Sequence, residues 1–203
     1  MTTLQVQSVA SPFVVDLSAI MPQLKMSDAQ FYEFCRTNRD LRIERTATGE
    51  VIVMPPAFSD TGNRNAKLLY QVMAWAEQDG TGETFDSSAG FTLPNGSTKS
   101  PDVSWIRLER WNQLSTEEKA SFAPICPDFV IELRSASDSL KRLQEKMTEY
   151  IENGVRLGVL IDRKNQTVHL YRPNQSPQIL ENPEVVSCEP ELQGLVLKMA
   201  RIW

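Results

Sequence analysis

The pattern of hydrophobic and polar positions divides the chain into strand-like and helix-like segments. Short runs rich in β-branched and aromatic residues predict β-strands, whereas apolar residues at every third or fourth position predict helices. The predicted strands are 41–45, 51–54, 83–86, 90–93, 102–108, 129–133, 155–161, 167–171 and 195–199. The predicted helices are a short one from Ser27, one over 63–78, one near 115–119 and one over 138–153. This order indicates an α/β fold with a mixed central sheet flanked by helices.

Two neighbouring segments stand out. The run Phe129–Leu133 is apolar except for Glu132, which is typical of a strand covered on both faces. The helix over 138–153 follows it. On a helical wheel of about 100° per residue, Lys146 lies about 90° from the centre of the apolar face, beside Tyr150, whereas Lys141 points further outward. Lys146 is therefore the basic residue of this helix that is best placed to reach the sheet.

The domain organisation follows from where the pattern is weak. Residues 1–26 carry little periodicity and contain Pro12 and Pro22, so we interpret them as an N-terminal arm. Residues 27–203 form one predicted domain, and the length and the hydrophobic content of the whole chain (41%) are sufficient for a core. An apolar run of about 18 residues, as a membrane span needs, is absent from the sequence, and so are the features of a signal peptide. We therefore expect a cytoplasmic protein with no membrane partner.

The rare residue types limit the chemistry. Cys35, Cys126 and Cys188 are far apart in the sequence, and His169 is the single histidine. The wide spacing of the cysteines disfavours a disulfide framework and a cysteine-based zinc site, and the single histidine excludes a site with several histidine ligands. Carboxylate, lysine and hydroxyl chemistry remains, and oxygen ligands favour Mg²⁺ or Mn²⁺.

Two acids are the candidate site. Asp102 begins one predicted strand and Glu132 lies inside another. An ionised Glu132 in so apolar a run costs several kcal/mol unless it meets a metal, a lysine or an exposed strand end. The alternative is a structural ion pair, for example with Arg134 or Arg107. Lys146 is the candidate cation for the pair of acids.

Lys146 also has an alternative interpretation. It is a solvated lysine on the flank of its helix, paired there with Glu145 or Glu149.

These residues lie in motifs that resemble a known family. The motifs are Arg42-Ile43-Glu44, Phe91-Thr92-Leu93-Pro94-Asn95-Gly96, Ser100-Pro101-Asp102-Val103-Ser104-Trp105-Ile106, Pro127 through Asp138, Lys146-Met147, Tyr150-Ile151, Asn153-Gly154-Val155 and Leu160-Ile161-Asp162. Together they closely resemble a large bacterial family of restriction endonuclease-like proteins in the PD-(D/E)XK superfamily. The resemblance covers roughly residues 31–172.

The resemblance implies a core of helix, mixed four-stranded sheet and flanking helix, with Asp102 and Glu132 as metal ligands. The sequence departs from the superfamily pattern because the lysine expected two residues after the glutamate is Arg134, which cannot act as a base. In this family the lysine has moved to the following helix, which matches Lys146. Glu44 is either a further acid of the site or a surface acid of its hairpin.

The function expected from these residues is Mg²⁺- or Mn²⁺-dependent hydrolysis of DNA phosphodiester bonds. Asp102, Glu132, Glu44 and the carbonyl of Leu133 would hold the cation, and Lys146 would orient water or stabilise charge. Because alternation along a strand puts residues 132 and 134 on one face, Arg134 is the alternative cation of the site.

Two other functions stay open. One is a non-catalytic nuclease-fold module that binds nucleic acid or a partner protein, and the other is a two-carboxylate glycosidase.

Charge and assembly refine the expected partners. The net charge is -5, and the stretch from Arg134 to Lys164 has only a small excess of basic residues, so tight binding of extended duplex DNA is disfavoured. Apolar positions in 178–181 and 195–199, with Trp203, predict a surface that a second copy covers. We therefore expect a homodimer.

Overall fold

A mixed six-stranded sheet forms the centre of the molecule. The computed structural model describes residues 13–15, 26–39, 41–54 and 56–203. The strand order is β11-β10-β9-β8-β7-β4, and the bounds are β4 Gly82–Asp86, β7 Val103–Arg107, β8 Phe129–Leu133, β9 Leu157–Asp162, β10 Thr167–Tyr171 and β11 Gln178–Glu181. Strands β8 and β9 are parallel, whereas the other neighbouring pairs are antiparallel. The α/β fold with a mixed sheet is confirmed.

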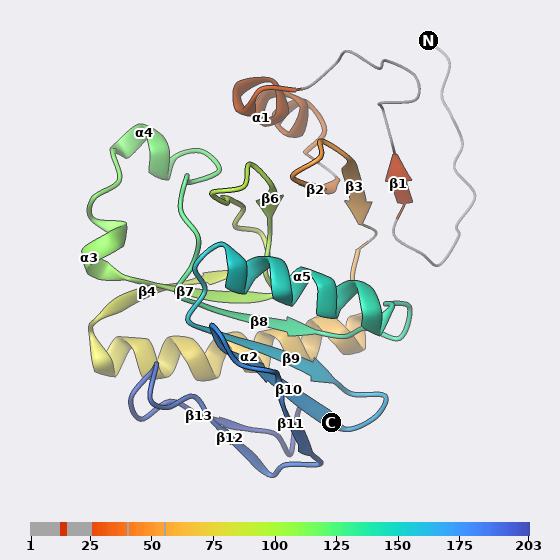
Figure 1. Cartoon of the computed structure of the whole chain (residues 1–203), viewed down its shortest axis with the longest axis vertical. Coiled ribbons are helices and arrows are strands. Elements are labelled where there is room, and N and C mark those ends of the chain that lie inside the picture. The colour runs from red at the N-terminus through yellow and green to blue at the C-terminus, as the bar shows by residue number, and fades with distance from the viewer. Residues whose placement is uncertain (1–12, 16–25, 40, 55) are drawn as a thin grey trace.

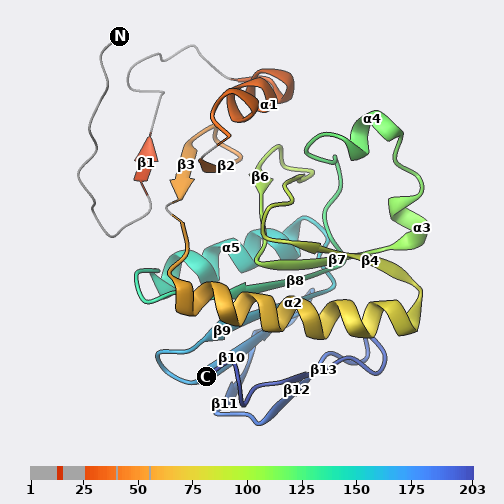
Figure 2. The ribbon, with the colours of Figure 1, turned by 180° about the vertical axis from the view of Figure 1, so that it is seen from behind.

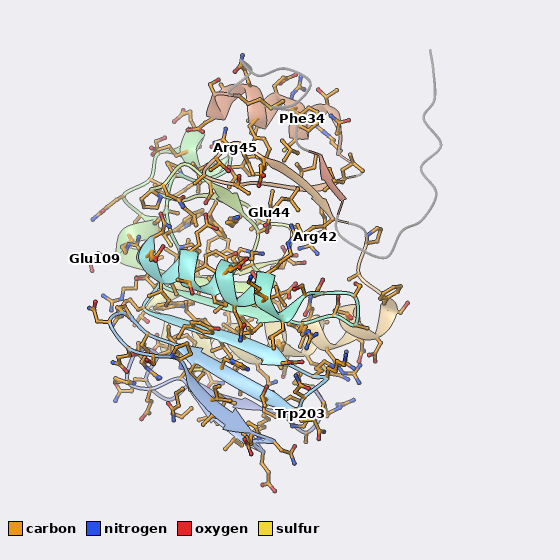
Figure 3. The ribbon with its side chains drawn as sticks, turned by 45° about the vertical axis from the view of Figure 1, so that its right-hand side comes forward. Phe34, Arg42, Glu44, Arg45, Glu109 and Trp203 are labelled. Atoms are coloured by element: carbon orange, nitrogen blue, oxygen red, sulfur yellow. The ribbon has the colours of Figure 1, made fainter. Side chains whose placement is uncertain are left out.

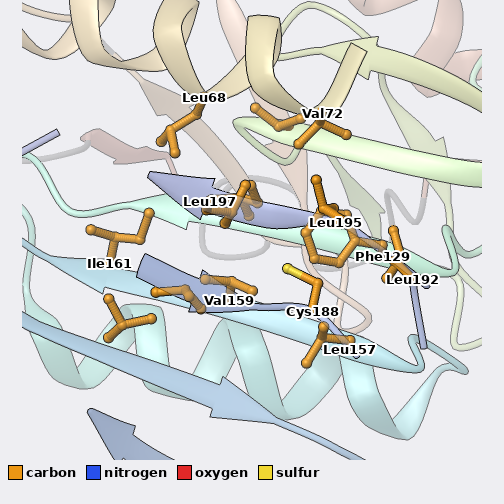
Figure 4. Packing of buried hydrophobic residues seen from close by; sticks show 14 of the residues in the cluster. Leu68, Val72, Phe129, Leu157, Val159, Ile161, Cys188, Leu192, Leu195 and Leu197 are labelled. Atoms are coloured by element: carbon orange, nitrogen blue, oxygen red, sulfur yellow. The ribbon is translucent and has the colours of Figure 1, made fainter. Parts of the chain in front are cut away.

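Helices cover both faces of this sheet (Figures 1 and 2). Helix α2 (Ser59–Asp79) packs on one face together with the hairpin of β12 (Val185–Ser187) and β13 (Val196–Lys198). Figure 4 shows Leu68 and Val72 of α2 above Phe129 of β8, with Leu195 and Leu197 in the same cluster. Helix α5 (Leu140–Glu152) covers the other face through Met147 and Tyr150, both fully buried. All five positions of β8 are buried, as the continuous apolar run predicts.

The structure corrects the predicted helix 63–78 in two respects. It begins earlier, at Ser59, whereas its end at Asp79, with Gly80 in the left-handed conformation just beyond it, is close to the predicted end. The sequence pattern favoured Leu69, Met73 and Ala76 as its inner face, but the buried stripe is Leu68, Val72 and Ala76, and Met73 is 45% exposed. The two stripes are adjacent on the helix, so periodicity alone does not separate them.

A second, smaller sheet lies beyond α5. Its order is β1-β3-β2-β6-β5, with β1 Phe13–Val15, β2 Arg42–Arg45, β3 Val51–Met54, β5 Phe91–Thr92 and β6 Thr98–Lys99. The β2–β3 hairpin is as predicted, and α1 (Asp28–Thr37) begins at Ser27 with a capping box. Strand β6 and helix α3 (Leu108–Trp111) were not predicted, because two to four residues carry too little periodicity. The predicted helix near 115–119 is α4 (Thr116–Lys119).

The predicted arm over 1–26 lies outside the described residues except for 13–15 and 26. Residues 13–15 form β1, which pairs with β3.

The packing of β13 covers part of the surface that we expected a second copy to cover. Leu195, Leu197 and Met199 are buried in the core under α2, so these positions are covered within one chain. Ile179 on β11 and Val185 on β12 stay exposed. Among the described helices, none is both long and apolar enough to cross a membrane.

Candidate functional site

Four charged side chains from four elements meet between the two sheets. Glu44 comes from β2, Asp102 directly precedes β7, Glu132 lies on β8 and Lys146 on α5. Glu132 faces α5, as does Val130 two residues before it. The Nζ atom of Lys146 lies 2.8 Å from Oε1 of Glu44 and 2.8 Å from Oε1 of Glu132. Figure 3 shows Glu44 and Arg42 above α5, on the side of the small sheet.

Asp102 is held by a backbone donor and by a side-chain donor. Its Oδ2 accepts the N–H of Leu133 at 2.8 Å, which ties it to the end of β8. Its Oδ1 accepts Nδ2 of Asn65, on α2, at 2.9 Å. The amide Oδ1 of Asn65 is buried and has no hydrogen-bond partner among the described residues. An unpaired buried acceptor costs free energy, so this oxygen is available to a ligand.

Glu44 is a buried member of the cluster and not a surface acid of its hairpin. Its side chain is 4% exposed, and Oε1 accepts the N–H of Ser100 at 3.0 Å as well as the Lys146 ammonium. Lys99, also buried, lies nearby and pairs with Glu149 at 3.1 Å. The sequence left the position of Glu44 open, and the structure places it inside.

Burial and charge set the protonation of these groups. Burial raises the pKa of Glu132 to about 7, and the nearby Lys146 charge opposes this only in part. Burial likewise raises the pKa of Asp102, against the lowering effect of the Leu133 N–H. Burial also opposes ionisation of Glu44, but the charges of Lys146 and Lys99 lower its pKa. Although burial disfavours an ammonium, Glu132 and Glu44 raise the pKa of Lys146, which stays charged.

The other basic residue considered, Arg134, is engaged elsewhere. Its Nη1 donates to Oδ2 of Asp162 at 2.8 Å, and its Nε donates to the carbonyl of Asp138. Asp162 is fully buried and neither partner lines the pocket that contains the cluster, so we interpret this as a structural ion pair. The alternative pairing of Lys146 with Glu145 or Glu149 is also wrong, because Lys146 contacts Glu44 and Glu132.

The cluster forms part of the lining of a pocket of about 520 Å³, which lies between the small sheet, α5 and the start of α2. Leu133, the predicted carbonyl ligand, is among its lining residues. Sequence reasoning missed Asn65 and Lys99, and it assigned Tyr150 only to the core. Tyr150 donates its hydroxyl to Oε1 of Glu132 at 3.1 Å. The sequence offered one signal of this role. Tyr150 lies in the apolar stripe of its helix, and a buried tyrosine hydroxyl needs a hydrogen-bond partner.

The oxygen chemistry of the donor set suits a hard divalent cation. Three carboxylates and the unpaired Oδ1 of Asn65 supply oxygen, which suits Mg²⁺ or Mn²⁺. In the part of the chain that the structure describes, no three or more His, Cys, Asp or Glu side chains lie close enough to hold a metal ion as they stand. The Lys146 ammonium bridges Glu44 and Glu132, so a cation there would compete with it.

Comparisons with known proteins agree with this fold. None of the curated proteins compared with the chain matches it. A solved structure of a nuclease assigned as putative and belonging to DUF820, from Anabaena variabilis ATCC 29413, has a similar fold with a TM-score of 0.66. The two are 22% identical, and the likeness covers 79% of this chain and 88% of that one.

The sequence model of the family described as "Putative restriction endonuclease" matches residues 28–200. This range includes all four residues of the cluster. The resemblance inferred from the motifs is therefore confirmed, and the chain belongs to that restriction endonuclease family.

Proposed function

We propose that this protein is a divalent-cation-dependent endonuclease that hydrolyses phosphodiester bonds of DNA in the cytoplasm. The observation that carries the proposal is the contact of one buried ammonium, that of Lys146, with Glu44 and Glu132 beside Asp102. A core that needed only an ion pair would match one lysine with one acid. Lys146 contacts two acids and has a third beside it, and a further cation would favour the ionised form of all three.

The roles of the residues follow from their contacts. Asp102, Glu132, Glu44 and the Leu133 carbonyl would hold Mg²⁺ or Mn²⁺, with Oδ1 of Asn65 as a further oxygen. A bound cation would polarise water and neutralise charge on the phosphate. Lys146 holds its charge beside the acids and would orient the attacking water or stabilise a phosphate oxygen. The N–H of Leu133 and the hydroxyl of Tyr150 orient Asp102 and Glu132.

A cleavage assay tests the proposal. Purified protein is incubated with plasmid and with single-stranded DNA in Mg²⁺, in Mn²⁺ and in EDTA, beside an Asp102→Asn preparation made in the same way. We expect cutting that requires metal and is lost in the variant. Cutting that persists in the variant identifies a contaminant, and absence of metal-dependent cutting under all conditions contradicts the proposal.

A non-catalytic module with the same fold is the second candidate. The charge of the pocket favours a module that binds a partner protein. Its lining has four basic and seven acidic side chains, whereas a nucleic-acid surface needs basic side chains. Titration with Mn²⁺ separates the two functions. A module whose acids serve only Lys146 binds no Mn²⁺ at Asp102 and Glu132.

We also propose that the active form is a homodimer. Its support is the exposed Ile179 on β11, which is an edge strand of the six-stranded sheet among the described residues. An unpaired sheet edge is a template for pairing with a second copy.

A further inference from the structure

One wall of the pocket carries apolar side chains beside the acids. Ile52 of β3 is the register partner of Glu44, and Met54 is the partner of Arg42. Directly paired residues of neighbouring strands share a face of the sheet, and all four line the pocket. The small sheet therefore presents an apolar surface directly beside the candidate cation site.

Phe58 extends this wall at the start of α2. It lines the pocket, yet 62% of its surface is exposed. Burying an aromatic ring contributes a large hydrophobic free energy, which the exposed Phe58 does not gain within this chain. Its face is available to a flat ligand, and stacking on aromatic rings is how proteins bind unpaired bases without regard to sequence.

Arg42 supplies an unpaired donor at the same wall. Its Nη2 donates to the carbonyl of Ser87 at 3.2 Å, which fixes the guanidinium. Its Nε is buried and has no acceptor among the described residues. A phosphate oxygen or a base carbonyl placed against Met54 would satisfy it.

The charge of the site argues against an intact duplex as its substrate. Duplex binding depends on many contacts from lysine and arginine to phosphates, whereas acidic side chains outnumber basic ones in the pocket and the net charge of the chain is -5. In a duplex the bases are also stacked and paired, so no base face can meet the wall. A nucleotide taken out of the stack exposes its base face, and it brings one phosphate to the pocket where a duplex brings many.

We infer that the pocket takes one unstacked nucleotide of DNA, with its base against Ile52, Met54 and Phe58 and an acceptor on Nε of Arg42. This inference rests on the proposed function and names its substrate class: single-stranded or locally unpaired DNA. The phosphate attached to that nucleotide would then lie at the acids and Lys146.

Binding of labelled oligonucleotides tests the inference separately from cleavage. Fluorescence anisotropy compares a single strand with its own duplex, in Ca²⁺ and in EDTA, for the wild type, Phe58→Ala and Phe58→Trp. We expect the wild type to bind the single strand more tightly than the duplex. Phe58→Ala should weaken single-strand binding about 5- to 150-fold, which corresponds to the loss of one base–aromatic stack. Phe58→Trp should restore it.

The matched control is Tyr70→Ala. Tyr70 is an aromatic residue of the same helix, 71% exposed and about three turns from Phe58, and its loss should leave binding unchanged. Duplex binding equal to single-strand binding, or a Phe58→Ala protein with wild-type affinity, overturns the inference even if metal-dependent cleavage is found. Single-strand binding that depends on Phe58 without any cleavage sustains it while the endonuclease proposal fails. Binding of neither DNA form overturns both.

Discussion

Lys146 and Glu132 form an ion pair of 2.8 Å between helix α5 and the buried strand β8. The same ammonium contacts Glu44 of the small sheet at 2.8 Å. One side chain thus joins acids from two separate sheets.

Replacing Lys146 by Met should remove the charge at the acids but keep most of the packing of the side chain. We expect cleavage to fall about 10²- to 10³-fold, the usual effect of losing one electrostatic contact to the transition state. Mn²⁺ affinity should be kept or increased, because the competing ammonium is gone. Lys141→Ala, on the same helix with an 84% exposed side chain, is the control and should be fully active.

Asp102→Asn should abolish metal binding with little loss of stability. An asparagine can still accept the N–H of Leu133, which Asp102 accepts at 2.8 Å, but it lacks the charge that a cation requires. Thermal unfolding with and without Mn²⁺ checks this. The wild type should be stabilised by the ion and the variant should not. A variant that unfolds far below the metal-free wild type would indicate a structural role instead.

Glu132 should make the metal-free protein less stable as the pH rises. Its pKa of about 7 in the folded protein lies above the ordinary value of 4.5. Between these two pH values the folded protein holds a proton that the unfolded chain releases, so stability falls as the pH rises through this window.

Glu132→Gln cannot titrate at this position. The free energy of unfolding of the wild type relative to the variant should therefore fall by about 2 kcal/mol between pH 5 and pH 8. Urea denaturation of both proteins in EDTA measures it. Taking the difference between the proteins cancels the titration of His169, and an equal difference at the two pH values would contradict the shift.

Arg134→Ala should affect stability rather than catalysis. It removes the partner of Asp162, which is fully buried, and breaking such a pair costs about 3 kcal/mol. Chemical denaturation should report this loss, while Mn²⁺ affinity stays at the wild-type value. If the variant is instead stable and inactive, and Lys146→Met is active, then Arg134 is the cation of the site.

The assembly prediction rests on the β11 edge. Light scattering should give twice the chain mass of 23.0 kDa at tens of micromolar protein, and Ile179→Lys should lower it to the mass of one chain. The substitution adds charge to a position that is 55% exposed in the monomer, so the fold should tolerate it. A wild-type mass of one chain contradicts the homodimer.

The sequence predicted those parts of the molecule that local periodicity controls. The helical wheel of 138–153 selected Lys146 because the residues that pack on the sheet define one side of that helix. The continuous run at β8 predicted a strand buried on both faces, and all its positions are buried. Both patterns depend only on neighbouring residues.

The remainder depends on which distant segments pack together. Leu197 alternates with exposed residues, as in a strand on the surface, but α2 covers it. Asn65 has no distinguishing neighbours in sequence and joins the site only because α2 passes Asp102. The sequence could not decide whether Glu44 is a site acid or a surface acid. Its partner Lys146 lies on a helix 102 residues further along the chain.

The long separation between Glu44 and Lys146 has a consequence for the newly made chain. During synthesis, β2 and then β8 emerge before α5, so the acids exist for a time without their ammonium. The site is complete only when segments 102 residues apart have docked across both sheets. A truncated or half-folded product therefore lacks the complete cluster of acids and ammonium, and the candidate site cannot form before α5 has docked against both sheets.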